Sequence, residues 1–176
     1  MRCPVAVTSS LKVGSTEQAV VVRVQERGTM KESPTLQNFV RETLKQSEMK
    51  VVLSLHDCSY LDSTFLGCMA GLYKQFSREN PPRFTVSCPN TLSKKMLAPM
   101  RLDQFLHVTS DEPQCQSEWV DLPSDDIDSH CWGLHVMECH RRLSQFDSPH
   151  AATFGRIADK LEHELSTHEV DGPRQA

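Results

Sequence analysis

One stretch of the chain decides its fold: residues 51–69, with the sequence VVLSLHDCSYLDSTFLGCM. It opens with an apolar run, typical of a buried central strand. A polar turn follows, and Asp62-Ser63-Thr64 then precedes a helix with an apolar stripe. Side-chain oxygens at such positions accept hydrogen bonds from the unpaired N–H groups of a helix N-terminus. We therefore expect Ser63 to be an exposed hydroxyl, aimed by two rigid elements, that receives a phosphate.

The composition is ordinary for a globular protein, with 38% hydrophobic and 24% charged residues among 176. Such a length can hold one good-sized core, or one domain with an appendage. A net charge of −4 offers no basic surface for a phosphate backbone, so nucleic acid is not an expected partner. No apolar run approaches the roughly 20 residues of a membrane span, and the N-terminus has too short an apolar stretch for a signal peptide. We expect no membrane partner.

The cysteines indicate a reducing compartment. They are odd in number and scattered, and no two of them form a C-x-x-C pair, whereas a secreted disulfide framework shows closer and even-numbered spacing. The seven are Cys3, Cys58, Cys68, Cys88, Cys115, Cys131 and Cys139. We therefore expect free thiols and a cytoplasmic protein.

Strands and helices are expected to alternate along the first 110 residues. Strands are predicted for Val5–Val7, Ala19–Val24, Lys50–Leu55, Phe84–Cys88 and Phe105–Val108. Helices are predicted from Ser33-Pro34, with serine as N-cap, after the Asp62-Ser63 turn with an apolar face from Phe65 to Phe76, and around Leu92–Leu97. Gly67 and Gly71 lie one turn apart and are expected to let the second helix approach its sheet closely. The order predicts an α/β fold with a mixed, largely parallel sheet of four to five strands flanked by helices.

The remaining residues divide into a linker, a helical hairpin and a tail. Residues 111–128 hold seven acids and no lysine or arginine, which is typical of a solvated acidic linker. Residues 129–169 carry two apolar stripes separated by the turn Asp147-Ser148-Pro149, and this pattern predicts a helical hairpin extension. Each helix has one apolar face, which must pack on the sheet domain, on the partner helix or on another protein. Residues 170–176 are expected to be a disordered tail.

Ser63 could instead be a hydrolase nucleophile, because a strand, turn and helix also build the nucleophile elbow. That elbow needs small residues beside the serine, and Leu61, Asp62 and Phe65 do not meet this requirement. An activating histidine would also have to come from elsewhere, with His107 as the candidate. His56 and Asp57 are close in sequence but are expected to be solvated. A third interpretation is that Asp62 or Ser63 merely caps the helix.

A second cluster invites a metal interpretation. Cys131, His135 and Cys139 follow at four-residue steps on one helix face, with His130 and His140 beside them, and thiols and imidazoles are zinc ligands. Structural zinc sites usually draw ligands from two elements, and Cys139 already belongs to the apolar stripe. We therefore expect an amphipathic, histidine-rich helix and no metal or other cofactor. No glycine-rich phosphate loop occurs, so nucleotide hydrolysis is not expected either.

The stretch VVLSL followed by Tyr60-Leu61-Asp62-Ser63-Thr64-Phe65-Leu66-Gly67 resembles the signature of STAS domains of the anti-anti-sigma factor type. The likeness covers roughly residues 5 to 110, and it implies a STAS-like domain over residues 1–110. In that family the serine after the aspartate is phosphorylated. The resemblance implies Ser63 as phosphoacceptor, Thr64 as a reserve acceptor, Asp62 as the positioning neighbour and Gly67 as the helix-packing glycine.

The chain departs from the family pattern at two positions. Ser54 stands where the strand usually has an aspartate, and Phe65 replaces a glycine after the two hydroxyls. We expect the Phe65 side chain to lie at the surface where a kinase docks, so that Asp62, Ser63, Thr64 and Phe65 form the partner-binding residues.

The resemblance implies a non-enzymatic module that switches partners. The unmodified protein would bind a serine kinase that otherwise holds a sigma factor, phosphate at Ser63 would change the binding surface, and a metal-dependent serine phosphatase would reverse the step. Two alternatives stay open: a constitutive adaptor or scaffold that is never phosphorylated, and a serine hydrolase. A homodimer through the hairpin is a further expectation.

Overall fold

The computed structural model describes residues 10–88 and 91–170 and has an α/β architecture. One mixed sheet has six strands in the order β7-β6-β4-β2-β1-β8, and a separate pair joins β3 to β5. The strands are β1 Leu11–Ser15, β2 Ala19–Val24, β3 Glu26–Gly28, β4 Lys50–Ser54, β5 Cys58–Leu61, β6 Phe84–Ser87, β7 Val108–Thr109 and β8 Val120–Asp121. The expected mixed sheet is confirmed, although it has more strands than predicted.

The centre of the sheet is parallel and one edge is antiparallel. β4 lies between β2 and β6 and is parallel to both. Val52 lies opposite Val21 of β2, and Leu53 lies opposite Val86 of β6. β1 pairs antiparallel with β2 on one side and with β8 on the other. Val51 and Leu53 are fully buried, as a central strand requires.

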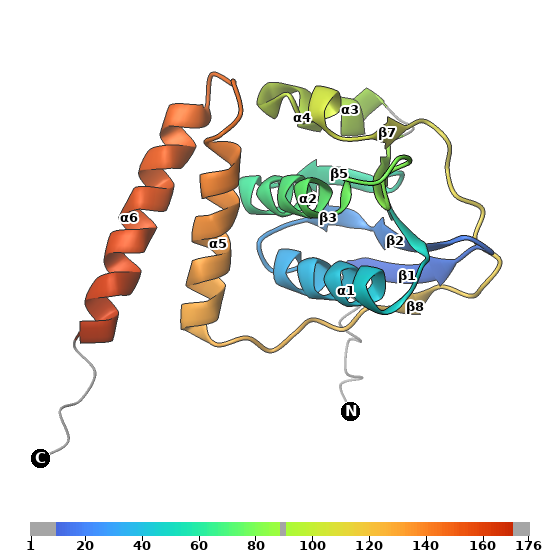
Figure 1. Cartoon of the computed structure of the whole chain (residues 1–176), viewed down its shortest axis with the longest axis horizontal. Coiled ribbons are helices and arrows are strands. Elements are labelled where there is room, and N and C mark those ends of the chain that lie inside the picture. Colours follow the sequence, from blue (N-terminus) through green and yellow to red (C-terminus); the bar gives the residue numbers. More distant parts are fainter. Residues whose placement is uncertain (1–9, 89–90, 171–176) are drawn as a thin grey trace, which may run out of the picture.

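Within residues 10–88 and 91–170, six α-helices and one 3₁₀ turn accompany the strands. They are α1 Ser33–Gln46, α2 Ser63–Phe76, α3 Thr91–Leu97, the 3₁₀ turn Ala98–Met100, α4 Leu102–Phe105, α5 Ser129–Leu143 and α6 Ala151–Val170. Figure 1 shows α1 and α2 side by side in front of the sheet, with α5 standing across their ends and α6 outside α5. The C-terminal helical hairpin is therefore part of the folded body, because α5 is packed against α2.

Several predicted elements are confirmed within a residue or two, namely β2, β4, β6, α1, α2, α3 and the two helices of the hairpin. The predicted strand Phe105–Val108 is wrong, because Leu102–Phe105 form α4 and the strand begins only at Val108. Ser33 is the first residue of α1 and not its cap, since Glu32 occupies the N-cap position. The predicted strand Val5–Val7 lies outside the described residues.

The acidic segment 111–128 is more than a solvated linker. Val120 and Asp121 pair with β1 as the edge strand β8. The Trp119 ring lies under the Arg23 guanidinium, whose carbon is 4.0 Å from the ring centroid, and Glu112 accepts a hydrogen bond of 2.9 Å from Arg23. These contacts hold the segment against the sheet, because a cation is attracted to an aromatic face and to a carboxylate.

The two glycines of α2 face the hairpin and not the sheet. A Cβ added at Gly67 would overlap the carbonyl oxygen of Cys139, and its carbonyl carbon would be only 2.7 Å away. A Cβ at Gly71 would meet the Arg142 side chain at 2.6 Å. The expected close approach is thus real, but its partner is α5, and only the absence of a side chain at Gly67 lets the two backbones come so near.

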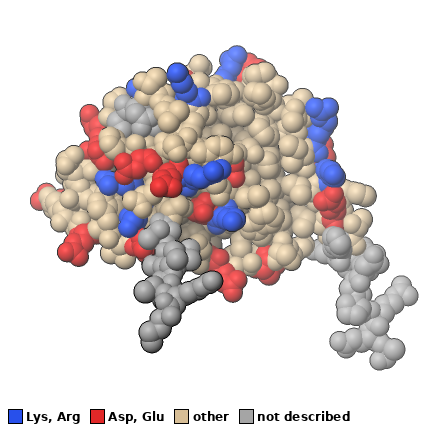
Figure 2. Space-filling view, turned by 180° about the vertical axis from the view of Figure 1, so that it is seen from behind, with Lys and Arg blue, Asp and Glu red and all other residues tan. Residues whose placement is uncertain are grey.

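The charges on the face opposite to that of Figure 1 are mixed. Figure 2 shows basic and acidic side chains interspersed there. Among the described residues, no helix is long and apolar enough to cross a bilayer.

Candidate functional site

Ser63 is the first residue of α2 and follows directly on strand β5 and its turn. Its side chain is half-buried, so it is less accessible than the sequence suggests. Asp62 is the N-cap, with extended backbone angles, and α2 begins immediately after it. The Ser63 hydroxyl therefore lies at the positive end of a 14-residue helix, where negative charge is stabilised.

Asp62 is tied into the fold through both carboxylate oxygens. Oδ1 accepts a hydrogen bond of 2.9 Å from the Phe65 backbone N–H, which caps α2. Oδ2 accepts one of 2.7 Å from the backbone N–H of Met30, in the turn that precedes α1. The carboxylate thus joins the starts of both helices.

Phe65 and Thr64 are inside the protein. Phe65 is 0% exposed and Thr64 is 2% exposed. The expected surface position of Phe65 is therefore wrong, and neither a partner nor a kinase can reach either side chain without unpacking α2. The physical reason is the helical register: a residue at the third position of α2 points toward the core, where its ring lies against Gly28.

His140 of α5 contacts the Ser63 hydroxyl. The distance from Ser63 Oγ to His140 Nε2 is 3.0 Å, and His140 Nδ1 is 2.9 Å from the carbonyl oxygen of Val136. Since a carbonyl oxygen can only accept, the neutral imidazole carries its proton on Nδ1 and Nε2 accepts from the serine. His140 is itself buried, with its ring centroid 5.6 Å from that of Phe154 in α6.

His135 makes a matching contact at the start of α1. Its Nε2 is 2.8 Å from Ser33 Oγ and 3.6 Å from Cys139 Sγ, and all three side chains are buried. Burial, together with Arg142 and Arg41, lowers the pKa of His135 to about 4. Helix α5 therefore places one neutral histidine against Ser33 and another histidine against Ser63, at the N-termini of two neighbouring helices.

The residues considered for a metal do not come together as ligands. Among the described residues, no group of three or more histidines, cysteines or acidic residues could hold a metal ion. Cys131 is exposed, where its thiol interacts with Asp128, the N-cap of α5. Cys139 is fully buried, and burial raises the pKa of its thiol to about 12, which disfavours the thiolate that metals bind.

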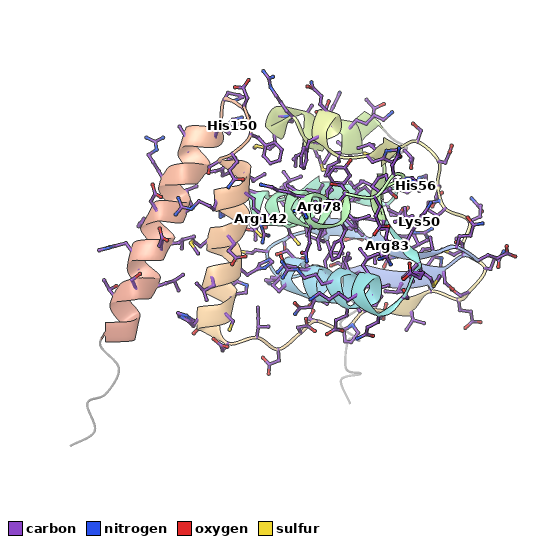
Figure 3. All side chains as sticks on the ribbon, viewed as in Figure 1. Lys50, His56, Arg78, Arg83, Arg142 and His150 are labelled. Atoms are coloured by element: carbon purple, nitrogen blue, oxygen red, sulfur yellow. The ribbon has the colours of Figure 1, made fainter. Side chains whose placement is uncertain are left out.

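Arg142 lines a cavity of about 180 Å³ between α2, α4 and the end of α5. Figure 3 labels Arg142 where α5 meets α2. Its guanidinium contacts Gln37 of α1 at 3.2 Å and Glu138 of its own helix at 2.9 Å. The cavity begins at Ala70, about two turns along α2 from Ser63. It is therefore separate from the serine.

The other histidines named from the sequence lie elsewhere. His107 is exposed and precedes β7, so it is not the histidine beside Ser63. His56 is 3.5 Å from Glu112, and Asp57 is 3.6 Å from Arg23, so both belong to a charged cluster around Arg23 (His56 is marked in Figure 3).

His135 and His140 were grouped as metal candidates from the sequence, and their contacts with serines were missed. Two signals pointed to them. One is the presence of imidazoles on or beside the apolar stripe of α5, and the other is the pair Gly67 and Gly71, which favours a close approach of a second helix. Neither signal predicts which residues of α1 and α2 face these histidines, because that depends on how the hairpin docks.

No protein-family model matches the chain, and no curated protein matches it. Among solved structures, the NMR structure of the protein TM1081 aligns with a TM-score of 0.48 at 20% sequence identity. The alignment covers 55% of this chain and 78% of that one.

Proposed function

We propose that this chain is a non-enzymatic signalling module of the anti-anti-sigma type, with a STAS-like domain switched by phosphorylation at Ser63. The observation that carries the proposal is the placement of one half-buried hydroxyl at the first residue of α2, directly after an aspartate N-cap. A helix N-terminus stabilises an added phosphate without refolding the domain, while the nearby Asp62 carboxylate repels it. Phosphate would therefore change the surface around Ser63 while the sheet domain keeps its fold.

The proposed partners are a serine kinase that doubles as an anti-sigma factor and a metal-dependent serine phosphatase, in the cytoplasm of a bacterium. The test is to incubate the full chain with candidate serine kinases and ATP and to map the phosphate by mass spectrometry. We expect modification at Ser63, abolished in Ser63→Ala, together with weaker binding of the kinase after modification. Binding without phosphate on Ser63 or Thr64 would favour a constitutive adaptor instead.

A serine hydrolase is the second candidate, and the 3.0 Å contact between Ser63 and His140 favours it. A histidine that accepts from a serine hydroxyl is the basic unit of an activated nucleophile. Here the histidine is oriented by a backbone carbonyl and lies against Phe154. The test is a fluorophosphonate probe: labelling of Ser63 that disappears in His140→Ala would support the hydrolase, and an unlabelled Ser63 would reject it.

Self-association through the hairpin belongs to the same proposal. Ile157 of α6 is 37% exposed on the hairpin, whereas the neighbouring Ala158 is buried. Light scattering of the full chain and of Ile157→Asp tests it, because a dimer held by this face would dissociate in the variant.

A further inference from the structure

Helix α5 packs directly against the first turns of α2 and leaves Ser63 half-buried. At Gly67, one turn beyond Ser63, the α2 backbone is in direct contact with the α5 backbone at Cys139. The Ser63 hydroxyl itself is 3.0 Å from His140, which is 7% exposed. Two packed backbones can separate but cannot approach further, so extra volume at Ser63 must move α5 outward.

A phosphoryl group needs more room than the docked hairpin leaves. It would add a phosphorus and three oxygens to an oxygen already in hydrogen-bond contact with His140 Nε2. The His140 ring also lies beside Phe154 of α6, with ring centroids 5.6 Å apart. A histidine that is 7% exposed has little room to move away while both hairpin helices stay in place.

Phosphorylation also changes the hydrogen bonding and the charge at the contact between Ser63 and His140. Ser63 donates its hydroxyl proton to His140, whose other ring nitrogen is engaged with Val136. A phosphoserine has lost that proton and adds about 1.5 to 2 negative charges, so the hydrogen bond donated by Ser63 to His140 is lost. The phosphate keeps the N-terminus of α2 as its stabilising environment.

We propose that a phosphate on Ser63 and the docked position of the α5–α6 hairpin exclude each other. The hairpin is an intramolecular cover of the modification site: it must swing out for Ser63 to be modified, and the phosphate then keeps it out. Because the coupling is reciprocal, whatever loosens the hairpin also makes Ser63 easier to modify. The use of this coupling in regulation rests on the proposed function. The coupling between phosphate on Ser63 and the hairpin is physical and does not depend on that function.

Three cysteine thiols together make the position of the hairpin measurable: one probe, one reference and one control. Cys139 is fully buried on the face of α5 that meets α2, and it becomes reactive only when the hairpin leaves. Cys131 is exposed near the start of α5 and is the reference for a solvent-accessible thiol. Cys88 follows β6 and is fully buried in the sheet domain, so its labelling reports unfolding of the body.

The experiment installs phosphoserine at position 63 of the full chain by genetic encoding and measures N-ethylmaleimide labelling of each cysteine by mass spectrometry. We expect Cys139 to react at least ten times faster than in the unmodified chain, with Cys88 unchanged. The control carries phosphoserine at Ser110, which is exposed, and should leave Cys139 protected. Equal protection of Cys139 with phosphate on Ser63 would overturn the proposal, and so would joint labelling of Cys139 and Cys88.

A matched pair of variants tests the docked geometry without phosphate. Gly67→Ala places a methyl group against the Cys139 backbone and should raise Cys139 labelling, whereas Gly71→Ala meets only the flexible Arg142 side chain and should not. Both changes add the same methyl group to the same helix. Equal labelling of Cys139 in the two variants would show that the backbone contact at Gly67 does not control docking of the hairpin.

The two proposals fail separately. Since the phosphate is installed during synthesis, hairpin release does not depend on any kinase. A chain that no kinase modifies but whose hairpin leaves on phosphorylation would count against the proposed function alone. A chain modified at Ser63 with its hairpin still docked would count against this inference alone.

Discussion

Asp62 divides its two carboxylate oxygens between the first turn of α2 and the turn that precedes α1. An N-cap aspartate is common, but here the second oxygen joins two helices whose first residues, Ser33 and Ser63, both face α5. Asp62 therefore links the starts of α1 and α2 in addition to placing a negative charge next to Ser63.

Replacing Asp62 separates these two roles. Asp62→Ala should lower the free energy of unfolding by about 1–2 kcal/mol, because the cap is lost. Asp62→Asn should cost less, since its amide oxygen can still cap α2 while its NH₂ group cannot accept from Met30. Urea unfolding measures both, and an alanine variant as stable as the original chain would contradict the role of the carboxylate as a cap.

His135 should make stability depend on pH. Its pKa is about 4 in the folded protein against 6.5 ordinarily, so below pH 6.5 the unfolded chain binds a proton that the folded chain refuses. The stabilisation is complete above pH 6.5 and is lost as the pH falls toward 4. The loss attributable to this one group at pH 5 is about 2 kcal/mol.

The measurement is urea unfolding at pH 7 and pH 5 for the original chain and for His135→Gln. The difference between the two pH values should be smaller in the variant. His163→Gln is the control, because His163 is an exposed histidine on α6 and should leave the pH dependence unchanged. An unchanged pH dependence in His135→Gln would show that His135 titrates normally in the fold.

At the scale of elements, the segment from Asp111 to Asp128 shows how a charged stretch becomes part of a sheet. Its acids are mostly exposed, as its composition indicates, yet Trp119 lies against both Arg23 and the backbone of Gly14. Because the Trp119 ring packs on Gly14 of β1, the next two residues, Val120 and Asp121, lie beside β1 and pair with it as the edge strand β8.

Removing the ring should release this segment. Trp119→Ala deletes a cation–π contact of about 0.5–1 kcal/mol together with the ring's packing on Gly14. We expect limited proteolysis between residues 111 and 121 to become several times faster. Glu118→Ala, at an exposed neighbouring position, is the control and should cleave at the original rate.

At the scale of the molecule, the hairpin and the sheet domain share one core. The core cluster includes Cys139, Leu143 and Phe154 of the hairpin beside Cys68 and Met69 of α2. The α2 helix is thus covered by the sheet on one side and by α5 on another (Figure 1). The face of α2 beside Ser63 is occupied by α5 of the same chain.

A chain that ends at Asp128 should keep its sheet but become less stable and more prone to self-association. It loses the burial of several apolar side chains, each contributing roughly 1.5–3 kcal/mol when fully buried. Circular dichroism, urea unfolding and light scattering test this prediction. A shortened chain as stable and monomeric as the full one would mean that the hairpin contributes nothing to the core.

The sequence by itself determined the α/β class, strand β4, helix α2 and the existence of the hairpin, while it left the cap of α2 open between Asp62 and Ser63. These follow from local causes: apolar runs and helical periodicity act over a few residues. Phe105–Val108 failed as a strand because a short apolar run does not distinguish helix from strand, and β8 was missed because two residues carry no periodicity.

Only the tertiary structure decided what meets Ser63. His140 follows it by 77 positions, and the docking of α5 against Gly67 sets which face of that helix the serine sees. Phe65 turned inward for a similar reason, since the orientation of α2 on the sheet selects its buried side. Contacts between distant segments depend on the packing of whole elements, and packing is a property of the assembled core rather than of any local pattern.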